Sequence, residues 1–531
     1  MLPLANFLQS GYAMRALRSM LASLFVVVGF FTLLDLVTMH QHLPGTGPSF
    51  YSWIAVIFLP LCGGLYTIAA AAYFLKWRSA RFWCLAVGAL NLVIPFMMCY
   101  IVWHFTHQSI ASILLENSLL LSLSLATIVA FWRWDPAAEK NLVKVESGAK
   151  PGDGTSSALN HGLPVISVLV FSWLWMQWNH WGDRTGLPAV SFWSSLSLAT
   201  AADFVVAFLH EAGHALCGLA LGSRITAFLA GPFQWHLHQG RWKFRLNPLT
   251  LLAMGGGAGV VPTRASEPKR FQLAMIAAGP LTSAVTGLVA LWMAFNAADS
   301  PWQSQWFFLA MFATISLEAA VVNLVPLRTA TGYSDGARIA QLFRGSVWAD
   351  LHEVFRTGAA TTVSAVRPAD YDIAAIHRPI AAGITNDSQT FLLRLLAYSF
   401  YIDRRQPEMA LQELSAAAEI YQGCAAKIPA ELHYGLVIGA AMERRDAAQA
   451  RMWWDRMEAK NPTWLNGDYW LGKSALHWTE GDCEAAKAAW NKAAQYLAEM
   501  PQVGTYAYDR DVLARLAAMI QTPATADAAM A

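Results

Sequence analysis

"VAFLHEAGHALCGLAL", residues 205–220, places two histidines and a glutamate within a stretch that is otherwise apolar enough to lie inside a lipid bilayer. On an α-helix, residues four apart share a face, so His210 and His214 can direct both imidazoles at one metal ion. Glu211 is turned about 100° from His210, which lets its carboxylate hold a water molecule beside that ion. The stretch therefore predicts a transmembrane helix with the HExxH pattern of a zinc site.

The alternative is a group of polar side chains that hydrogen-bond to one another within a helical bundle. An ionisable group at the middle of a bilayer costs at least about 2.5 to 3.5 kcal/mol, and this stretch carries three within five residues. Such a concentration needs a compensating function. The energetic argument favours the metal site, although short motifs also arise by chance.

The composition is that of a membrane protein. Of 531 residues, 56% are hydrophobic and only 14% are charged, and the mean hydropathy is +0.36, which excludes an ordinary soluble protein. A helix needs about 20 apolar residues to cross the hydrocarbon core. Eight windows of that kind occur, at 19–40, 51–75, 83–104, 108–132, 164–181, 190–221, 271–297 and 305–327. The sequence predicts an all-α polytopic membrane protein with about eight transmembrane helices.

Lysine and arginine are distributed unevenly among the predicted loops. They cluster before the first span and after the second, fourth and sixth, whereas the loops after the first and seventh spans contain neither. The positive-inside rule then places the N- and C-termini in the cytoplasm, with the protein in the cell membrane. The net charge of +2 reflects this bias, and without a basic cluster interleaved with aromatics no nucleic-acid partner is expected.

Composition also suggests the domain boundaries. The polar stretch 135–162 is rich in Gly, Ser and Lys, and reads as a cytoplasmic linker between a four-span region, 1–134, and a membrane core, 163–342. Beyond Asp335 no window is apolar for long enough to span, so residues 343–521 are expected to form a soluble, cytoplasmic helical domain. The tail, 522–531, is expected to be disordered.

Three similar segments suggest helical repeats within that domain. They begin at 404 ("RRQPEMALQEL"), 444 ("RRDAAQARMWW") and 480 ("EGDCEAAKAAW"), each at the start of the second helix of a predicted hairpin. Ala410, Ala450 and Ala486 occupy the matching small-residue position, in steps of 40 and 36 residues. These steps are close to the tetratricopeptide period of about 34 residues. An irregular helical bundle without superhelical stacking is the alternative.

Two imidazoles leave a zinc site incomplete, because catalytic zinc usually has three protein ligands. Asp335 follows the last span in "NLVPLRTATGYSDGARIAQL" (323–342), within a turn that contains glycine, and it is predicted to lie at a depth similar to that of His210. The same aspartate could instead cap the helix that follows it. Cys217, on the helical face of the histidines, is the other candidate ligand or else a small packed apolar side chain.

Three motifs in order resemble the site-2 protease family of intramembrane zinc metalloproteases: "HEAGH" at 210, "AAGPLTS" at 277, and "NLVP" at 323 with "SDG" at 334. The resemblance covers roughly 190–342. It implies that His210 and His214 are the first two zinc ligands and that Asp335 is the third. It also implies that Glu211 is the catalytic base and that Asn323 positions the substrate.

Two features depart from the family pattern. Ser283 stands where the middle span usually has Asn, and Asn323 and Asp335 are 12 residues apart, about four more than in compact relatives, so "RTATGYS" must loop out. Relatives carry a small membrane-embedded β-hairpin where this chain has residues 224–262, and its glycine-rich run suits close approach of a backbone.

The resulting expectation is a zinc metalloendopeptidase that performs regulated intramembrane proteolysis on membrane-embedded or membrane-proximal protein substrates. The lipid bilayer is a partner, and the C-terminal helical region is expected to bind a cytoplasmic protein. One alternative is a catalytically inactive membrane scaffold that binds its partner through these helices. Another is a transporter, for which acidic residues within spans would be expected, although no inverted repeat is evident.

Overall fold

The computed structural model describes residues 18, 21, 22, 25, 65, 66, 68, 69, 73, 80–89, 127, 128, 131, 155, 157–238, 241–247, 256–328, 332–460 and 466–521. Most of the predicted N-terminal spans, most of the linker and the tail 522–531 lie outside these residues. Described residues from all four N-terminal spans, among them Phe25, Tyr66, Val87 and Phe131, share one buried apolar cluster. One helix, α8, begins at Ser157, inside the predicted linker, because polar composition alone does not separate a loop from the first turns of a helix.

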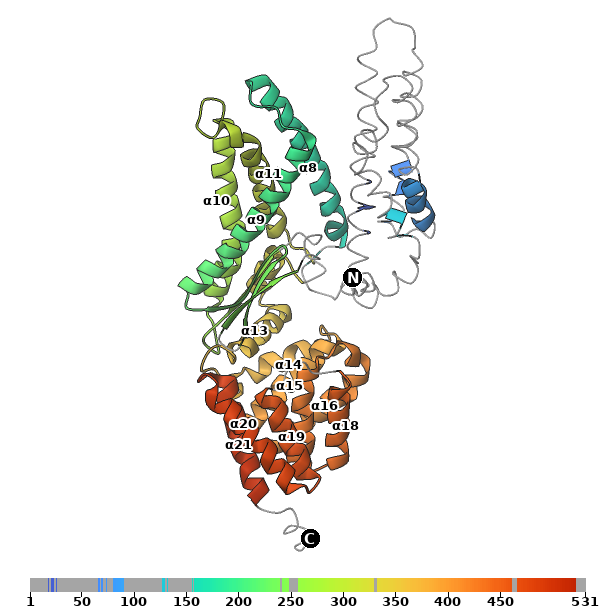
Figure 1. Ribbon diagram of the computed structural model, residues 1–531, viewed down its shortest axis with the longest axis vertical. Helices are drawn as coiled ribbons and strands as arrows, with labels where there is room; N and C mark the ends of the chain where they lie inside the picture. The colour runs from blue at the N-terminus through green and yellow to red at the C-terminus, as the bar shows by residue number, and fades with distance from the viewer. Residues whose placement is uncertain are drawn as a thin grey trace, which may run out of the picture.

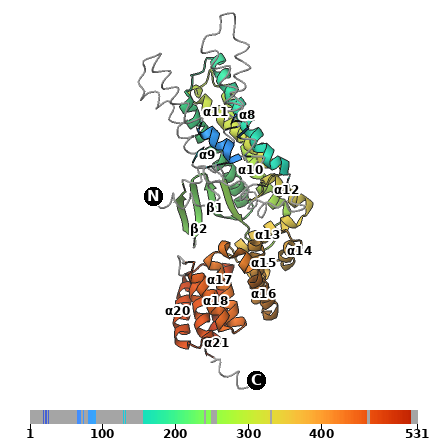
Figure 2. The ribbon, with the colours of Figure 1, turned by 90° about the vertical axis from the view of Figure 1, so that its right-hand side faces the viewer.

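Three of the described helices are long and apolar enough to cross a membrane. They are α9 (Phe192–Ala220), α10 (Lys269–Phe295) and α11 (Trp306–Leu324), which coincide with the predicted spans 190–221, 271–297 and 305–327. The predicted span 164–181 lies in α8 (Ser157–Thr185), which is not one of the three. The count of eight spans therefore stays a prediction. Both ribbon views show α8 to α11 grouped at one end of the described chain (Figures 1 and 2).

Small residues allow these helices to approach closely. A side chain at Gly213 of α9 would overlap Thr282 and the Ala278 carbonyl of α10. Such close backbone contact is typical of helix packing in membranes. At the other side of the group, Trp178 of α8 donates its indole N–H to Thr314 Oγ1 of α11 at 2.9 Å.

A four-stranded antiparallel sheet lies beside the membrane helices, in the order β3-β2-β1-β4. Its strands are β1 (Arg224–Ala230), β2 (Phe233–His238), β3 (Arg241–Leu246) and β4 (Gly256–Val261). The predicted hairpin is present as part of a larger sheet, because the glycine-rich run returns as β4 and pairs with the free edge of β1. The run lacks the alternating β-branched residues that mark a strand. Val260 of β4 packs where a side chain at Gly218 of α9 would stand.

Two helices connect this membrane part to the C-terminal part: α12 (Asp335–Arg344) and α13 (Val347–Ala360). Gly345, with φ of 57°, adopts the left-handed conformation that ends α12. On α13, Trp348 and Leu351 belong to the large C-terminal core, whereas Ala349 packs with Val260 and neighbouring residues of the membrane part.

The C-terminal helices form antiparallel pairs around one core, which we call the helical unit (Figure 1). Its pairs are α15 with α16, α17 with α18, and α19 with α20. The helices of the unit are α14 (Ile373–Ala381), α15 (Asp387–Asp403), α16 (Pro407–Cys424), α17 (His433–Ile438), α18 (Ala447–Glu458), α19 (Gly467–Thr479), α20 (Cys483–Glu499) and α21 (Gly504–Gln521).

The second helix of each pair begins in the same way. Arg405, Arg445 and Gly481 have φ of 57°, 53° and 84°, and each precedes the first residue of α16, α18 or α20 by two positions. The predicted small positions, Ala410, Ala450 and Ala486, are all completely buried in these helices. The pairs therefore share a turn and a packing position, and their assignment to tetratricopeptide repeats stays a prediction.

One carboxyl group in this core is buried without a donor. Asp509 of α21 is 7% exposed, and no described residue hydrogen-bonds to its Oδ2. Burial, and then the charge of Asp468, raise the pKa of Asp509 well above that of an ordinary aspartate. A carboxyl whose pKa is raised on folding contributes stability that is present at low pH and is lost as the pH rises through that pKa.

We therefore expect the helical unit to lose stability as the pH rises above about 4, the ordinary pKa of an aspartate in the unfolded chain, and Asp509→Asn to reduce this loss. At pH 8 the variant should be more stable than the parent by about 1 to 3 kcal/mol, since the amide carries no charge. Calorimetry of the full-length protein in detergent at several pH values measures the difference. Glu499→Gln, an exposed change on α20, should leave the pH dependence unchanged. Equal pH dependence in Asp509→Asn and the parent would contradict the prediction.

Candidate metal centre

Three side chains from two elements converge between α9, α10 and α12. His210 and His214 lie one turn apart on α9, with their Nε2 atoms 3.3 Å apart. Asp335 Oδ2 lies 3.2 Å from His210 Nε2 and 3.3 Å from His214 Nε2. Among the described residues, these three form the one group of His, Cys, Asp and Glu that could hold a metal ion. Tetrahedral zinc with ligands about 2.0 to 2.1 Å away separates its donor atoms by about 3.3 Å, so the group fits zinc.

Hydrogen bonds on the far side of each ring orient the imidazoles. His214 Nδ1 lies 2.8 Å from the Met275 carbonyl, which can only accept, so Nδ1 carries the proton. His210 Nδ1 lies 2.9 Å from Ser283 Oγ. With the Nδ1 proton of His214 used in this way, its Nε2 is free to bind a metal ion, and it faces His210 Nε2 and the Asp335 carboxylate oxygen. These three metal-binding atoms can share one cation, and such outer partners are typical of histidines that bind metal.

Helix α10 leaves room for the two rings through Gly279. A side chain at this position would overlap His214 Nε2, and its Cβ would lie 2.8 Å from His210 Nε2. Ser283, one turn later on α10, is 1% exposed, and its backbone carbonyl accepts a hydrogen bond from Ser316 of α11. The same face of α10 therefore supplies both the space and a hydrogen-bond partner for the imidazoles.

A closed turn delivers Asp335 to the first position of α12. Ser334 caps this helix: its Oγ accepts from Ala337 N and Leu327 N, at 3.2 and 2.9 Å, and donates to the Val325 carbonyl at 2.7 Å. A side chain at Gly336 would overlap the carbonyl of Leu324, so α12 lies directly against the end of α11. The segment "RTATGYS" (328–334) was predicted to loop out. A β-bridge between Arg328 and Tyr333 closes the base of this segment, in agreement with the prediction, and residues 329–331 lie outside the described residues.

Asp335 is ionised in this setting. Burial acts to raise the pKa of its carboxyl, but the close contacts with the imidazoles of His210 and His214 outweigh burial and lower the pKa to about 2. A carboxylate is the form that binds a metal ion. Asp335 is therefore charged where the two imidazoles meet, and Ser334, not Asp335, caps α12.

Strand β4 holds Glu211 beside this group. The backbone of Ala258 hydrogen-bonds to the Glu211 carboxylate, and a side chain at Gly256 would lie 2.5 Å from Glu211 Cγ. Close approach to a carboxylate thus explains Gly256, whereas a side chain at Gly259 would meet Thr226 and Ala227 of β1. Glu211 points to the same space as the metal group without being part of it.

A cavity of about 800 Å³ contains the predicted site residues. Its wall includes His210, Glu211, His214, Asn323 and Asp335, together with Asp203 from the preceding turns of α9. Asn323 donates from its amide nitrogen to Ala319 O at 2.9 Å, within α11. All five residues chosen from the sequence therefore lie around one space.

Other residues of the site were not predicted, or were predicted differently. Ser283 contacts His210 even though it stands where the family pattern has Asn, and a polar residue one turn after a Gly-Pro was the available signal. Met275 and Gly279 gave no such signal. Cys217 lies outside the metal group, packed against the apolar cluster of Val260, Met275 and Ile276.

Comparison with known proteins gave a match to one family model. No curated protein and no solved structure matches the chain. One protein family matches a segment that begins before α9 and ends just after α14, so the match includes every residue of the candidate centre. Residues 185–383 match the family model described as Peptidase M50B-like, which supports a membrane metalloprotease family and a relation to the site-2 proteases.

Proposed function

We propose that the protein is an intramembrane zinc endopeptidase that hydrolyses peptide bonds of membrane-embedded or membrane-proximal protein substrates. The observation that carries the proposal is the contact of three metal-binding atoms, 3.2 to 3.3 Å apart, beside Glu211 in one cavity. Two histidines from an apolar helix and a carboxylate from the adjoining turn have no other evident reason to meet there.

The residues divide the chemistry among them. Zn²⁺ held by His210, His214 and Asp335 would supply a Lewis acid that activates water and polarises a carbonyl group. Glu211 would take a proton from the attacking water and deliver it to the leaving amine. Asn323, across the cavity, would hydrogen-bond to the substrate backbone and position it.

Strand β4 supplies a means of holding the substrate. It is an edge strand of the sheet and lines the cavity with Gly256–Val261. A substrate segment that pairs with an edge strand becomes extended, and its peptide bonds lose the helical hydrogen bonds that protect them. Pairing along β4 would draw such a segment past Glu211.

The remaining sequence expectations belong to the same proposal. Eight spans with cytoplasmic termini would place the metal centre toward the cytoplasmic face, and tetratricopeptide-like pairs would bind a cytoplasmic partner that recruits or restrains the substrate. The competing function is an inactive scaffold. The metal group favours the enzyme, because a scaffold needs no contact between two imidazoles and a carboxylate.

The test is metal analysis combined with proteolysis. Purified without chelators, the protein should contain about one zinc ion per chain, and a chelator should abolish cleavage of a co-expressed transmembrane substrate until zinc is restored. Absence of zinc would contradict the metal centre. A second outcome would support the scaffold. In that case the protein contains zinc, but cells that carry Glu211→Gln have the same membrane proteins as cells that carry the parent.

Ser283 provides a more selective test of the outer hydrogen bonds. Ser283→Ala should weaken zinc binding by about 10- to 100-fold, since His210 loses the partner that orients its ring. Competition with a chelator of known affinity measures this change. Thr286→Val is the matched control, because it removes a hydroxyl one turn later on α10 that contacts Ser316 rather than a histidine. Equal zinc affinity in the Ser283→Ala variant and the parent would show that this contact does not support the metal.

A further inference from the structure

Arg338 lies in the wall of the same cavity, one turn after Asp335 on α12. Its charge acts on the carboxylates of Asp335 and Glu211. Neither carboxylate is within ion-pair distance, and among the described residues none hydrogen-bonds to the Arg338 guanidinium. A guanidinium stays protonated at any physiological pH, so this is a permanent positive charge that faces the cavity.

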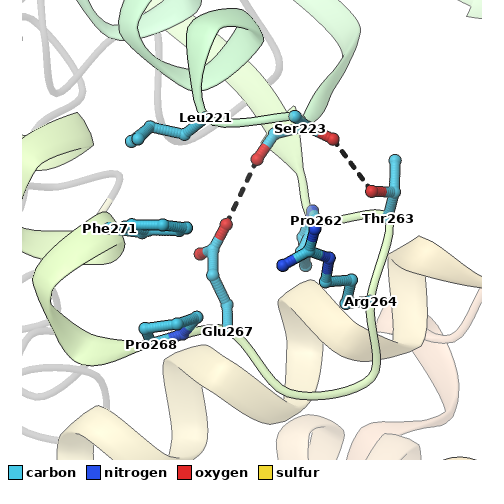
Figure 3. A pocket seen from close by; sticks show the side chains of 9 residues that line it. Leu221, Ser223, Pro262, Thr263, Arg264, Glu267, Pro268 and Phe271 are labelled. Carbon is cyan, nitrogen blue, oxygen red and sulfur yellow. Dashed lines mark hydrogen bonds between the residues drawn. The ribbon is translucent and has the colours of Figure 1, made fainter.

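Arg356, a second arginine of the cavity wall, differs from Arg338 because it forms ion pairs with carboxylates of the protein. Arg356 of α13 donates from Nη2 to Glu267 Oε2 at 2.8 Å, and its Nη1 lies 3.7 Å from Glu353. Glu267 also accepts from Ser223 Oγ at 3.2 Å, at the edge of a small hollow formed by the end of α9 and the loop before α10 (Figure 3). The charge of Arg356 is therefore balanced within the protein.

Helix α13 supplies no carboxylate partner for Arg338 among the described residues. The titratable groups of α13 that interact electrostatically with Arg338 are Arg356 and His352, and burial, Arg338 and Arg356 together lower the pKa of His352 to about 3. His352 is thus neutral and brings no negative charge. Phe355 and Ala359 complete this side of the cavity wall with apolar surface. A cation in such surroundings is best stabilised by an anion that enters the cavity.

We propose that Arg338 is a specificity residue that binds a carboxylate of the substrate, which would make the enzyme prefer segments with an acidic group close to the cleaved bond. This inference rests on the proposed function. Carboxylates are the anions that an unmodified peptide carries, and the guanidinium fork binds them through two parallel hydrogen bonds. The carboxylate comes from an Asp or Glu side chain or from the C-terminus of a shortened substrate.

The two sources are separated by synthetic transmembrane peptides that share one apolar segment. One series carries a single Asp at successive flanking positions, each with an Asn counterpart. A second series has no internal acid and ends in either a free carboxylate or an amide. With zinc-loaded wild-type protein in lipid nanodiscs, one series should contain an acid that raises kcat/KM by about 10- to 100-fold over its amide counterpart. The series in which this occurs identifies the source.

Variants then assign the preference to Arg338. Arg338→Gln should lower kcat/KM for the acidic peptide to that of its amide counterpart, without changing the value for the amide, and Arg338→Lys should retain part of the preference. Arg344→Gln, an exposed change on the same helix, should retain all of it. Zinc content should equal that of the wild type in each variant, which shows that the centre is intact.

Two results of the cleavage experiments would overturn the proposal. One is a wild-type protein that cleaves acidic and amide peptides equally well. The other is an Arg338→Gln variant that loses the same factor on both peptides, since the arginine would then act on the reaction or the fold. If no peptide is cleaved, the proposed endopeptidase function fails for these substrates. Binding of the same labelled peptides to the zinc-loaded protein then tests the carboxylate site separately. Equal affinity for acid and amide peptides would overturn the carboxylate site by itself.

Discussion

Glu211→Gln is expected to reduce peptide cleavage by about 10² to 10⁴-fold while zinc remains bound. The amide has nearly the size of the carboxylate, but it cannot take a proton from water at neutral pH. Both imidazoles and Asp335 are unchanged, and Glu211 is not part of the metal group. Cleavage of a reconstituted transmembrane peptide and zinc content are measured on the same preparation.

A second substitution at this position gives the control for Glu211. Glu211→Asp retains a carboxylate but draws it back by one methylene from the place where Ala258 and Gly256 hold it, so intermediate activity is expected. Normal cleavage by zinc-loaded Glu211→Gln would exclude Glu211 as the base. Loss of zinc from that variant would instead mean that Glu211 contributes to metal binding.

Asp335→Ala is expected to lose both zinc and activity. The free energy of zinc binding, about 10 to 16 kcal/mol in structural sites, corresponds to about 3 to 4 kcal/mol for each of four ligands, so loss of one ligand should weaken binding by about 10² to 10³-fold. Asp335→Asn retains an oxygen donor without the charge and should lie between this variant and the parent. Zinc content after dialysis against a weak chelator measures the series.

Cys217→Ala is the matched control for Asp335. It removes the other ligand considered from the sequence, which packs in an apolar cluster, and should leave zinc occupancy unchanged. Full zinc occupancy in Asp335→Ala would place the third ligand elsewhere, and a combined loss with Cys217→Ala would then identify the thiol.

Local patterns made the main features predictable. HExxH is confined to five residues of one helix, so the spacing that brings His210 and His214 together is visible in the sequence. The apolar windows of α9, α10 and α11 follow equally from length and composition. The position of Asp335 needed more, because the resemblance to a family supplied the pairing and the structure supplied the turn that closes through Ser334.

Long-range contacts explain what was missed. Ser283 and His210 are 73 residues apart in the chain, and their contact depends on how α9 crosses α10 at Gly213. The role of Gly279 likewise depends on the neighbouring helix. The fourth strand, β4, is not evident from the sequence because glycine has no side chain to alternate and because the strand pairs with β1, far along the chain.

The dual packing of α13 also constrains how the protein can be redesigned. Trp348 and Leu351 complete the core of the helical unit, whereas Phe355, Arg356 and Ala359 of the same helix form part of the cavity wall. A chimera joined within α13 would have to rebuild two unrelated surfaces at once.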